Sequence, residues 1–241
     1  MTDSLEGQRV LVIGGSSGLG LATAVHAHQR GAEVTIAARS REKLDIARKA
    51  VGERCTIAEA DVGDEKSMAL LFEDRSGIDH IFFSAGRYPR ALIRDAEVEK
   101  VRVGLEDRFW GAFFVCKYGA SKLRKDGSIT FVTGVAVFKP AGPGGSVVVA
   151  GAGAVDAFTR SMAKELAPIR VNSLSPGLCD TSLVRGIYGD AWEQVAKSWS
   201  ERVLVGRVGS PDDIAHAAMF LMTNTYVTGT TLHVEGGQRL V

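Results

Sequence analysis

Short apolar runs alternate with longer stretches of helical periodicity along the chain. The runs are brief and rich in β-branched residues, which is typical of strands. They predict strands at residues 9–13, 34–38, 55–58, 79–84, 128–132, 169–174 and 230–235. The intervening stretches predict helices at residues 19–30, 41–51, 64–73, 98–122, 147–166, 190–202 and 211–222.

The predicted strands have no polar face, and each is followed by a helix or a loop. This pattern predicts an α/β fold, with a doubly wound, mainly parallel, seven-stranded Rossmann-type sheet and helices on both faces. In such a fold the ligand binds at the carboxyl ends of the strands, where the strand order reverses.

Composition and charge limit the kinds of binding partner that the protein is expected to have. The 241 residues carry a formal net charge of +1, which favours neither a nucleic acid nor an anionic membrane. No run approaches the roughly 20 apolar residues of a membrane helix, and the first residues do not resemble a signal peptide. The three cysteines, Cys55, Cys116 and Cys179, are far apart, and no metal site is expected. We expect a cytoplasmic protein.

A glycine-rich turn lies between the first predicted strand and the first predicted helix. Gly14, Gly18 and Gly20 follow a GxxxGxG spacing. Glycines let bare backbone amides and a helix N-terminus approach a pyrophosphate, so the turn predicts a dinucleotide site. The alternative is a purely structural turn. The same segment contains Ser16, Ser17 and Leu19, which we expect to contact the dinucleotide.

The end of the second predicted strand indicates which dinucleotide binds. An acidic residue there would hold the ribose 2′-hydroxyl of NAD. This chain instead has Arg39 and Ser40, which suit a 2′-phosphate. We therefore expect NADP(H) rather than NAD(H), with a solvated surface arginine as the alternative.

With these features the whole chain resembles the short-chain dehydrogenase/reductase family. Asp61 and Val62 match a pair that flanks the adenine in that family, although Asp61 could instead be a turn residue or a cap. Ser84, Ala85 and Gly86 match the end of its Asn-Asn-Ala-Gly motif. The resemblance implies that these residues line the cofactor site.

A second group of matches lies in the C-terminal half. The run 169–177 is very close to the family pattern, which implies that Pro176 and Gly177 pass the nicotinamide and that Thr181 reaches its carboxamide. Residues 207–215 and 228–237 also fit. The resemblance spans residues 8–238, and it implies one dinucleotide-binding domain over 1–241, a small-molecule substrate and a homo-oligomer, either a tetramer or a dimer.

The resemblance breaks at the catalytic positions. The family uses a Tyr as acid or base, a Lys four residues later, a Ser and an Asn. These positions fall on Val148, Ala152, Gly134 and a position near Arg108. All four differ, and Val and Ala carry no titratable group.

No replacement for the missing acid stands out. Thr133 and Lys139 are weak candidates in the loop expected over the nicotinamide, and a solvent-facing role for Lys139 is the stronger alternative. Ser146 is expected to cap the following helix. Tyr88 and Tyr188 lie in segments expected to border the pocket, where packing is the commoner role.

Three functional hypotheses remain open. The first is an NADP-dependent oxidoreductase of atypical mechanism, acting on a substrate such as an iminium or an activated enone that needs no Tyr. The second is a catalytically inactive NADP(H)-binding regulator or partner subunit. The third is a non-redox enzyme that uses the bound nucleotide structurally. The presence of Pro176, Gly177 and Thr181 favours the first.

Overall fold

The computed structural model describes residues 4–140 and 142–241. Its centre is a seven-stranded sheet in the order β3-β2-β1-β4-β5-β6-β7, and every neighbouring pair is parallel. The predicted doubly wound fold is confirmed. The strands are β1 (Arg9–Ile13), β2 (Glu33–Ala38), β3 (Thr56–Glu59), β4 (Ile78–Phe83), β5 (Leu123–Val132), β6 (Arg170–Pro176) and β7 (Thr231–Val234).

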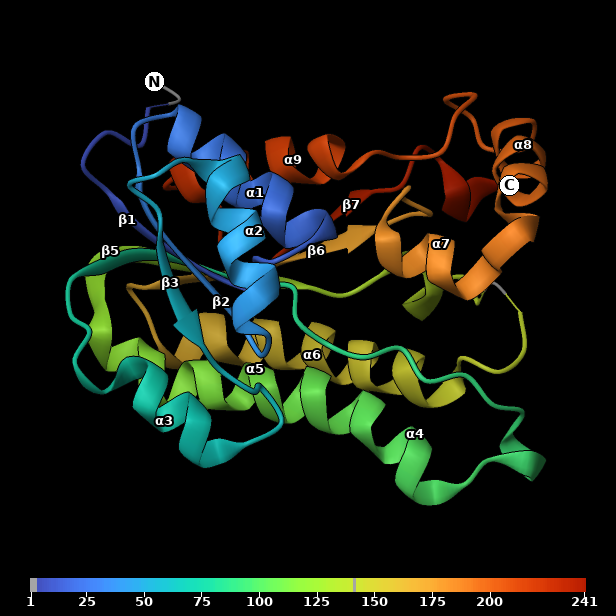
Figure 1. Cartoon of the computed structure of the whole chain (residues 1–241), viewed down its shortest axis with the longest axis horizontal. Helices are drawn as coiled ribbons and strands as arrows, with labels where there is room; N and C mark the ends of the chain where they lie inside the picture. The colour runs from blue at the N-terminus through green and yellow to red at the C-terminus, as the bar shows by residue number, and fades with distance from the viewer. Residues whose placement is uncertain (1–3, 141) are drawn as a thin grey trace.

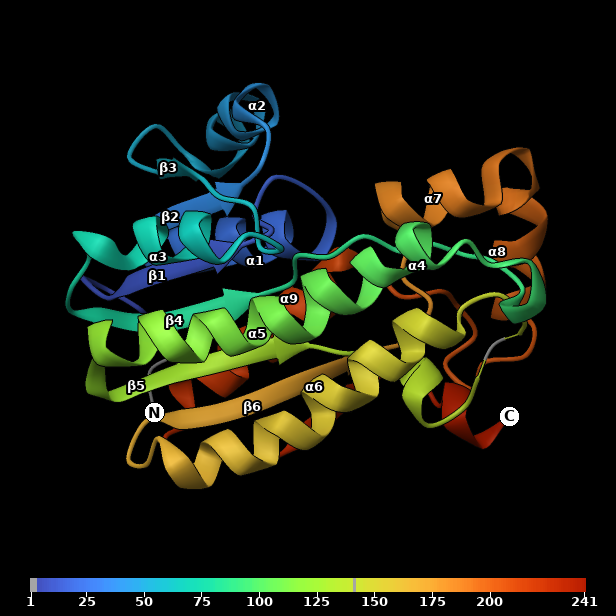
Figure 2. The same ribbon diagram turned by 90° about the horizontal axis from the view of Figure 1, so that it is seen from below.

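Helices cover both faces of the sheet (Figures 1 and 2). One layer is formed by α1 (Gly18–Gln29), α2 (Arg41–Val51) and α9 (Pro211–Thr223). The other is formed by α3 (Glu65–Glu73), α4 (Val98–Leu105), α5 (Gly111–Phe114) and α6 (Ser146–Glu165). Beyond the carboxyl ends of the strands lie α7 (Ser182–Tyr188) and α8 (Trp192–Ser200).

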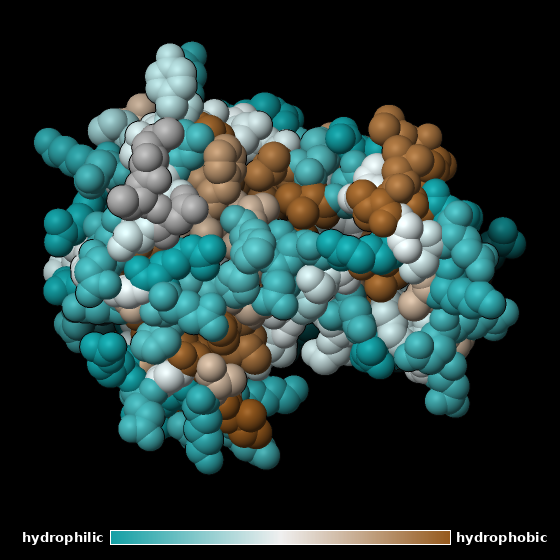
Figure 3. All heavy atoms as spheres, turned by 90° about the horizontal axis from the view of Figure 1, so that it is seen from above, coloured by the Kyte–Doolittle hydropathy of each residue, from teal (hydrophilic) through white to brown (hydrophobic). Residues whose placement is uncertain are grey.

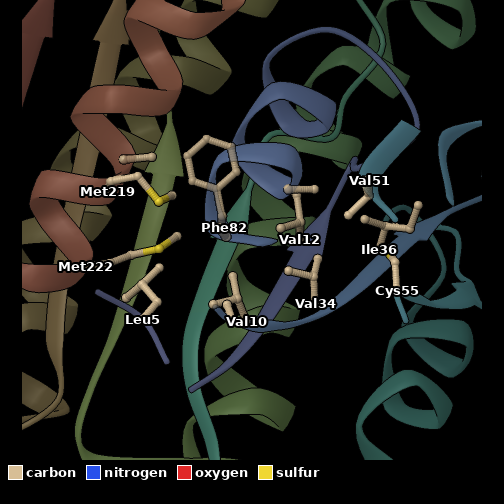
Figure 4. Packing of buried hydrophobic residues seen from close by; sticks show 14 of the residues in the cluster. Leu5, Val10, Val12, Val34, Ile36, Val51, Cys55, Phe82, Met219 and Met222 are labelled. Atoms are coloured by element: carbon tan, nitrogen blue, oxygen red, sulfur yellow. The ribbon is translucent and has the colours of Figure 1, made fainter. Parts of the chain in front are cut away.

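Two apolar clusters hold these layers together. The first joins the sheet to the layer of α1, α2 and α9, and Figure 4 shows Val12 and Phe82 from the strands facing Met219 from α9. The second lies on the opposite face, where Phe131 packs against side chains from α3, α5 and α6. Burial on both faces explains why the strands carry few polar side chains.

The region of the long predicted helix, residues 98–122, is helical throughout but not uniform. Two π-helical turns, η2 (Glu106–Trp110) and η3 (Val115–Gly119), interrupt the α-helical geometry. Such turns re-aim the side chains they contain and are frequent at functional sites. The first of them carries Asp107 and Arg108.

One local expectation was wrong, and one short helix was missed. Ser146 does not cap α6, because Gly145 occupies the N-cap and Ser146 is the first helical residue. The short helix α7 was not predicted at all. Within the described residues, no helix is both long enough and apolar enough to cross a membrane.

Candidate functional site

The glycine-rich turn joins β1 to α1 and leaves no room for side chains. Gly14 and Gly18 have φ angles of 91° and 52°, which favour glycine. A Cβ atom on Gly14 would lie 2.7 Å from the amide nitrogen of Ala85, and one on Gly20 would collide with the carbonyl oxygen of Gly14. The glycines therefore allow β1, the turn and the end of β4 to pack backbone against backbone.

This turn forms one wall of a cavity of about 1340 Å³. The cavity follows the carboxyl ends of the strands, and Figure 3 shows the surface hollowed between the part that carries α1 and α2 and the part that carries α7 and α8. Of the sixteen residues expected to bind the cofactor, fifteen line it. They are Gly14, Ser16, Ser17, Gly18, Leu19, Gly20, Arg39, Ser40, Val62, Ser84, Ala85, Gly86, Pro176, Gly177 and Thr181.

Asp61 is the exception. Its neighbours Ala60 and Val62 line the cavity, but Asp61 does not. Its Oδ1 atom accepts a hydrogen bond from the backbone nitrogen of Gly63 at 3.0 Å. This is the turn role that stood as the alternative to an adenine contact.

One end of the cavity is basic. Arg39 follows β2, and Ser40 caps α2 by accepting a hydrogen bond from the backbone nitrogen of Lys43 at 3.3 Å. Lys43 also lines the cavity. Sequence reasoning missed it, although its place in the first turn of the helix after Arg39 was a usable signal. Arg39 makes no ion pair with the described part of the chain.

Thr181 shows how the other wall is built. Its side chain caps α7 by accepting a hydrogen bond from the backbone nitrogen of Val184 at 3.3 Å, and it lines the cavity. The capping bond uses a lone pair of the hydroxyl oxygen, so the hydroxyl proton stays available to a ligand. Tyr188, at the end of the same helix, lines the cavity as well.

The two candidate proton donors differ in position. Thr133 is buried and lines the cavity, but its hydroxyl donates to the carbonyl oxygen of Leu174 at 3.0 Å. Lys139 is not among the lining residues, so the structure gives no support to its role as an acid. Cys179 lines the cavity too, and burial raises the pKa of its thiol to about 12, which keeps it protonated at neutral pH.

Val148 and Ala152 lie on α6 and are buried. Neither lines the cavity. A Cβ atom on Gly104 of α4 would lie 3.0 Å from Cγ2 of Val148, so this side chain packs toward α4. The part of α6 that does reach the cavity contributes Ser146, Val149 and Ala150.

Arg87 and Asp107, which both line the cavity, form an ion pair that the sequence did not predict. Asp107 is buried and accepts from Nη2 of Arg87 at 2.6 Å and from Nε at 2.8 Å. It also accepts from the backbone nitrogen of Arg87 at 2.9 Å. The hydrogen bonds to Asp107 raise the pKa of Arg87. The pair ties the loop after β4 to the π-helical turn η2.

Arg108 follows directly in η2 and lines the cavity. Its Nε atom is buried and has no hydrogen-bond partner in residues 4–140 and 142–241. The Cζ atom lies 5.8 Å from the centroid of the Tyr88 ring, within range of a cation–π contact. Burial lowers the pKa of Arg108, yet a guanidinium keeps its charge at neutral pH.

Comparison with known proteins agrees with this geometry. A family model described as enoyl-(acyl carrier protein) reductase matches residues 14–239. The short-chain dehydrogenase/reductase ATR9 of Stachybotrys chlorohalonatus is 31% identical, over 97% of this chain and 98% of that protein. The chain belongs to the short-chain dehydrogenase/reductase family. The resemblance noted in the sequence is therefore confirmed.

Two solved structures resemble this short-chain dehydrogenase/reductase along its whole length. One is a small-chain dehydrogenase in complex with NADPH, with 32% identity, a TM-score of 0.83 and coverage of 98% of this chain and 100% of the other. The second is an NADPH-bound oxidoreductase from Pseudomonas aeruginosa PAO1, described as containing an atypical catalytic center. It shares 26% identity, with a TM-score of 0.87 and coverage of 96% and 98%.

Proposed function

We propose that this oxidoreductase binds NADP(H) in the cavity at the carboxyl ends of its strands. The turn between β1 and α1 offers bare backbone where Cβ atoms would intrude, which suits a pyrophosphate. Arg39 and Lys43 line the same cavity beyond β2, where a 2′-phosphate needs cations. NADPH is the ligand in two of the similar solved structures, which supports the assignment.

We further propose that it transfers a hydride without the usual Tyr acid or base. The observation that carries this proposal is that Val148 and Ala152 are buried and apolar, and that neither lines the cavity. The bound NADP(H) supplies or accepts the hydride. The protein positions the nicotinamide with Pro176, Gly177 and Thr181.

The missing proton donor limits the substrates. A ketone must gain a proton on oxygen as it gains the hydride, and a hydroxyl held by a backbone carbonyl, as in Thr133, is a poor acid. An iminium carries its charge before reduction, and an activated enone places the new charge on a distant atom. Both classes suit this site better than a simple ketone.

The experiment is to follow oxidation of saturating NADPH by the enzyme with matched panels of ketones, enones and preformed iminium ions. Turnover of iminium ions or enones at rates at least about a hundredfold above those of the ketones is expected, because general acid catalysis contributes about that much. Efficient ketone reduction would overturn the proposal. Binding of NADPH with no turnover on any panel would favour an inactive regulator or partner subunit.

We also propose that the protein is a cytoplasmic homo-oligomer. The aromatic side chains of Trp110, Phe113 and Phe114 cluster on the α4–α5 region, and Trp110 is half exposed. An exposed aromatic cluster is typical of an interface. The three cysteines are free and buried, as suits a reducing compartment. Light scattering during size-exclusion chromatography tests the assembly, and a monomeric mass at micromolar concentration would contradict it.

A further inference from the structure

The charges around the cavity are unbalanced. Among the described lining residues the only acidic side chain is Asp107. Five basic side chains line the same cavity, namely Arg39, Lys43, Arg87, Arg90 and Arg108. Arg39 and Lys43 serve the nucleotide end under the proposed function, and Arg87 lies beside Gly63, next to the expected adenine contact. Arg90 and Arg108 remain for the substrate end.

Asp107 compensates only one of the arginines that line the cavity. Both of its carboxylate oxygens bind Arg87, at 2.6 and 2.8 Å. Arg90 donates through Nη2 to the carbonyl oxygen of Pro143 at 3.0 Å, which satisfies one donor without neutralising the charge. The side chain of Arg108 forms no ion pair or hydrogen bond with any residue in 4–140 and 142–241.

The position of Arg108 shows where the unbalanced positive charge lies. The π-helical turn η2 directs its side chain against Gly86, where a Cβ atom would lie 3.3 Å from Cγ of Arg108. Its Nε atom is fully buried without a partner, and Tyr88 covers the guanidinium at 5.8 Å. The nearest acid, Asp107, already binds Arg87 through both oxygens, so the partly buried guanidinium of Arg108 has no carboxylate of its own. A cation in this position is commonly satisfied by an anionic ligand.

We propose that the substrate carries a carboxylate group, and that Arg108 binds this carboxylate beside the nicotinamide. This inference rests on the proposed function, because it concerns the second ligand of the same cavity. The phosphates of the nucleotide are held elsewhere. Under the proposed function they lie at the start of α1, whereas Arg108 comes from the helical layer on the opposite face of the sheet.

The other residues that line the substrate end indicate the nature of the rest of the substrate. Leu183, Ile187 and Tyr188 of α7 and Trp199 of α8 line the cavity and provide an apolar surface. The ligand that fits is therefore a carboxylate attached to an apolar body. The carboxylate meets Arg108, and the apolar body lies against α7 and α8.

The test measures binding without turnover. Protein saturated with NADP⁺ is titrated calorimetrically with trans-cinnamate and with its uncharged methyl ester. We expect the acid to bind at least about tenfold more tightly than the ester, since a charge-assisted hydrogen bond has that order of strength. In Arg108→Gln the acid should lose this advantage, and Arg108→Lys should keep part of it.

Arg102→Gln is the matched control, because Arg102 is exposed one and a half turns earlier and pairs with Glu99. It should bind both probes as the wild type does. If Arg108→Gln does not fold, modification of wild-type arginines by phenylglyoxal replaces it. Cinnamate, and not its ester, should then protect Arg108 in the peptide map.

Three results would overturn the proposal. They are equal affinity of the wild type for acid and ester, an undiminished preference for the acid in Arg108→Gln, and no protection of Arg108 by cinnamate. A weaker affinity of Arg108→Gln for NADP⁺, with no acid preference in the wild type, would assign Arg108 to the nucleotide instead. Failure of NADP⁺ itself to bind would contradict the proposed function rather than this inference.

Discussion

Arg87 and Asp107 form a two-pronged ion pair, with Nη2 to Oδ1 at 2.6 Å and Nε to Oδ2 at 2.8 Å. Asp107 is buried, and Arg87 keeps 40% of its side chain exposed. The pair connects the loop after β4 to the π-helical turn that carries Arg108. The pair therefore contributes to the stability of the folded chain and to the position of the turn that carries Arg108.

We expect Asp107→Asn to lower the free energy of unfolding by about 2 kcal/mol. Breaking a buried pair costs about 3–5 kcal/mol, and the partial exposure of Arg87 reduces this loss. Urea denaturation measures the change. Asp95→Asn, at an exposed position, is the control. A loss in Asp107→Asn that equals the control would show that the pair adds no stability.

Gly20→Ala tests the packing of the glycine turn. Its Cβ atom would collide with the carbonyl oxygen of Gly14, which is backbone and cannot rotate away. We expect NADPH affinity to fall at least about tenfold, because the amides that face the pyrophosphate must move. Gly186→Ala, where a Cβ meets nothing within 4 Å, should bind NADPH as the wild type does. Equal NADPH affinity of the two variants in a fluorescence titration would show that the turn tolerates a Cβ atom at Gly20.

His80 makes stability depend on pH. Burial and, to a smaller extent, the charge of Arg170 lower its pKa from an ordinary value of 6.5 to about 4, against a smaller opposite effect of Asp126. Both ring nitrogens are satisfied in the neutral form. Nε2 donates to Oε1 of Gln8 at 2.7 Å, and Nδ1 accepts from the hydroxyl of Ser128 at 2.8 Å.

The lowered pKa of His80 sets the direction in which pH changes the stability of the fold. Above pH 6.5 the unfolded and folded forms are both neutral at this residue, and the stability is fully present. As the pH falls toward 4 the unfolded chain gains a proton that the folded chain does not, so the free energy of unfolding declines by up to about 3 kcal/mol. Urea titrations between pH 7.5 and 4 should show this decline in the wild type and in His216→Gln. A decline of the same size in His80→Gln would contradict it.

The fold was predictable because its signals are local. The strands and the turn from Gly14 to Gly20 were placed to within a few residues, since short apolar runs and glycine spacing depend only on neighbouring positions. Helix α7 escaped prediction because it is short, contains Gly186 and has no buried residues that would create an apolar stripe.

The substrate end was less predictable because its contacts join distant segments. The Arg87–Asp107 pair spans twenty positions and a loop, and nothing in either neighbourhood marks it. Arg108 could be seen only as a residue near a position where the family has Asn. Its unpartnered Nε atom depends on three-dimensional packing. Asp61 allowed two roles, and the structure places its carboxylate on the Gly63 amide.

Under the proposed function, Arg39 selects NADP(H) over NAD(H) in this cavity. The most direct test is the dissociation constant of NADPH and of NADH, measured by fluorescence for the wild type and for Arg39→Ala. We expect Arg39→Ala to weaken NADPH binding at least about tenfold and to leave NADH binding nearly unchanged, because only NADPH carries the 2′-phosphate. An equal loss for both nucleotides, or no loss for either, would contradict it.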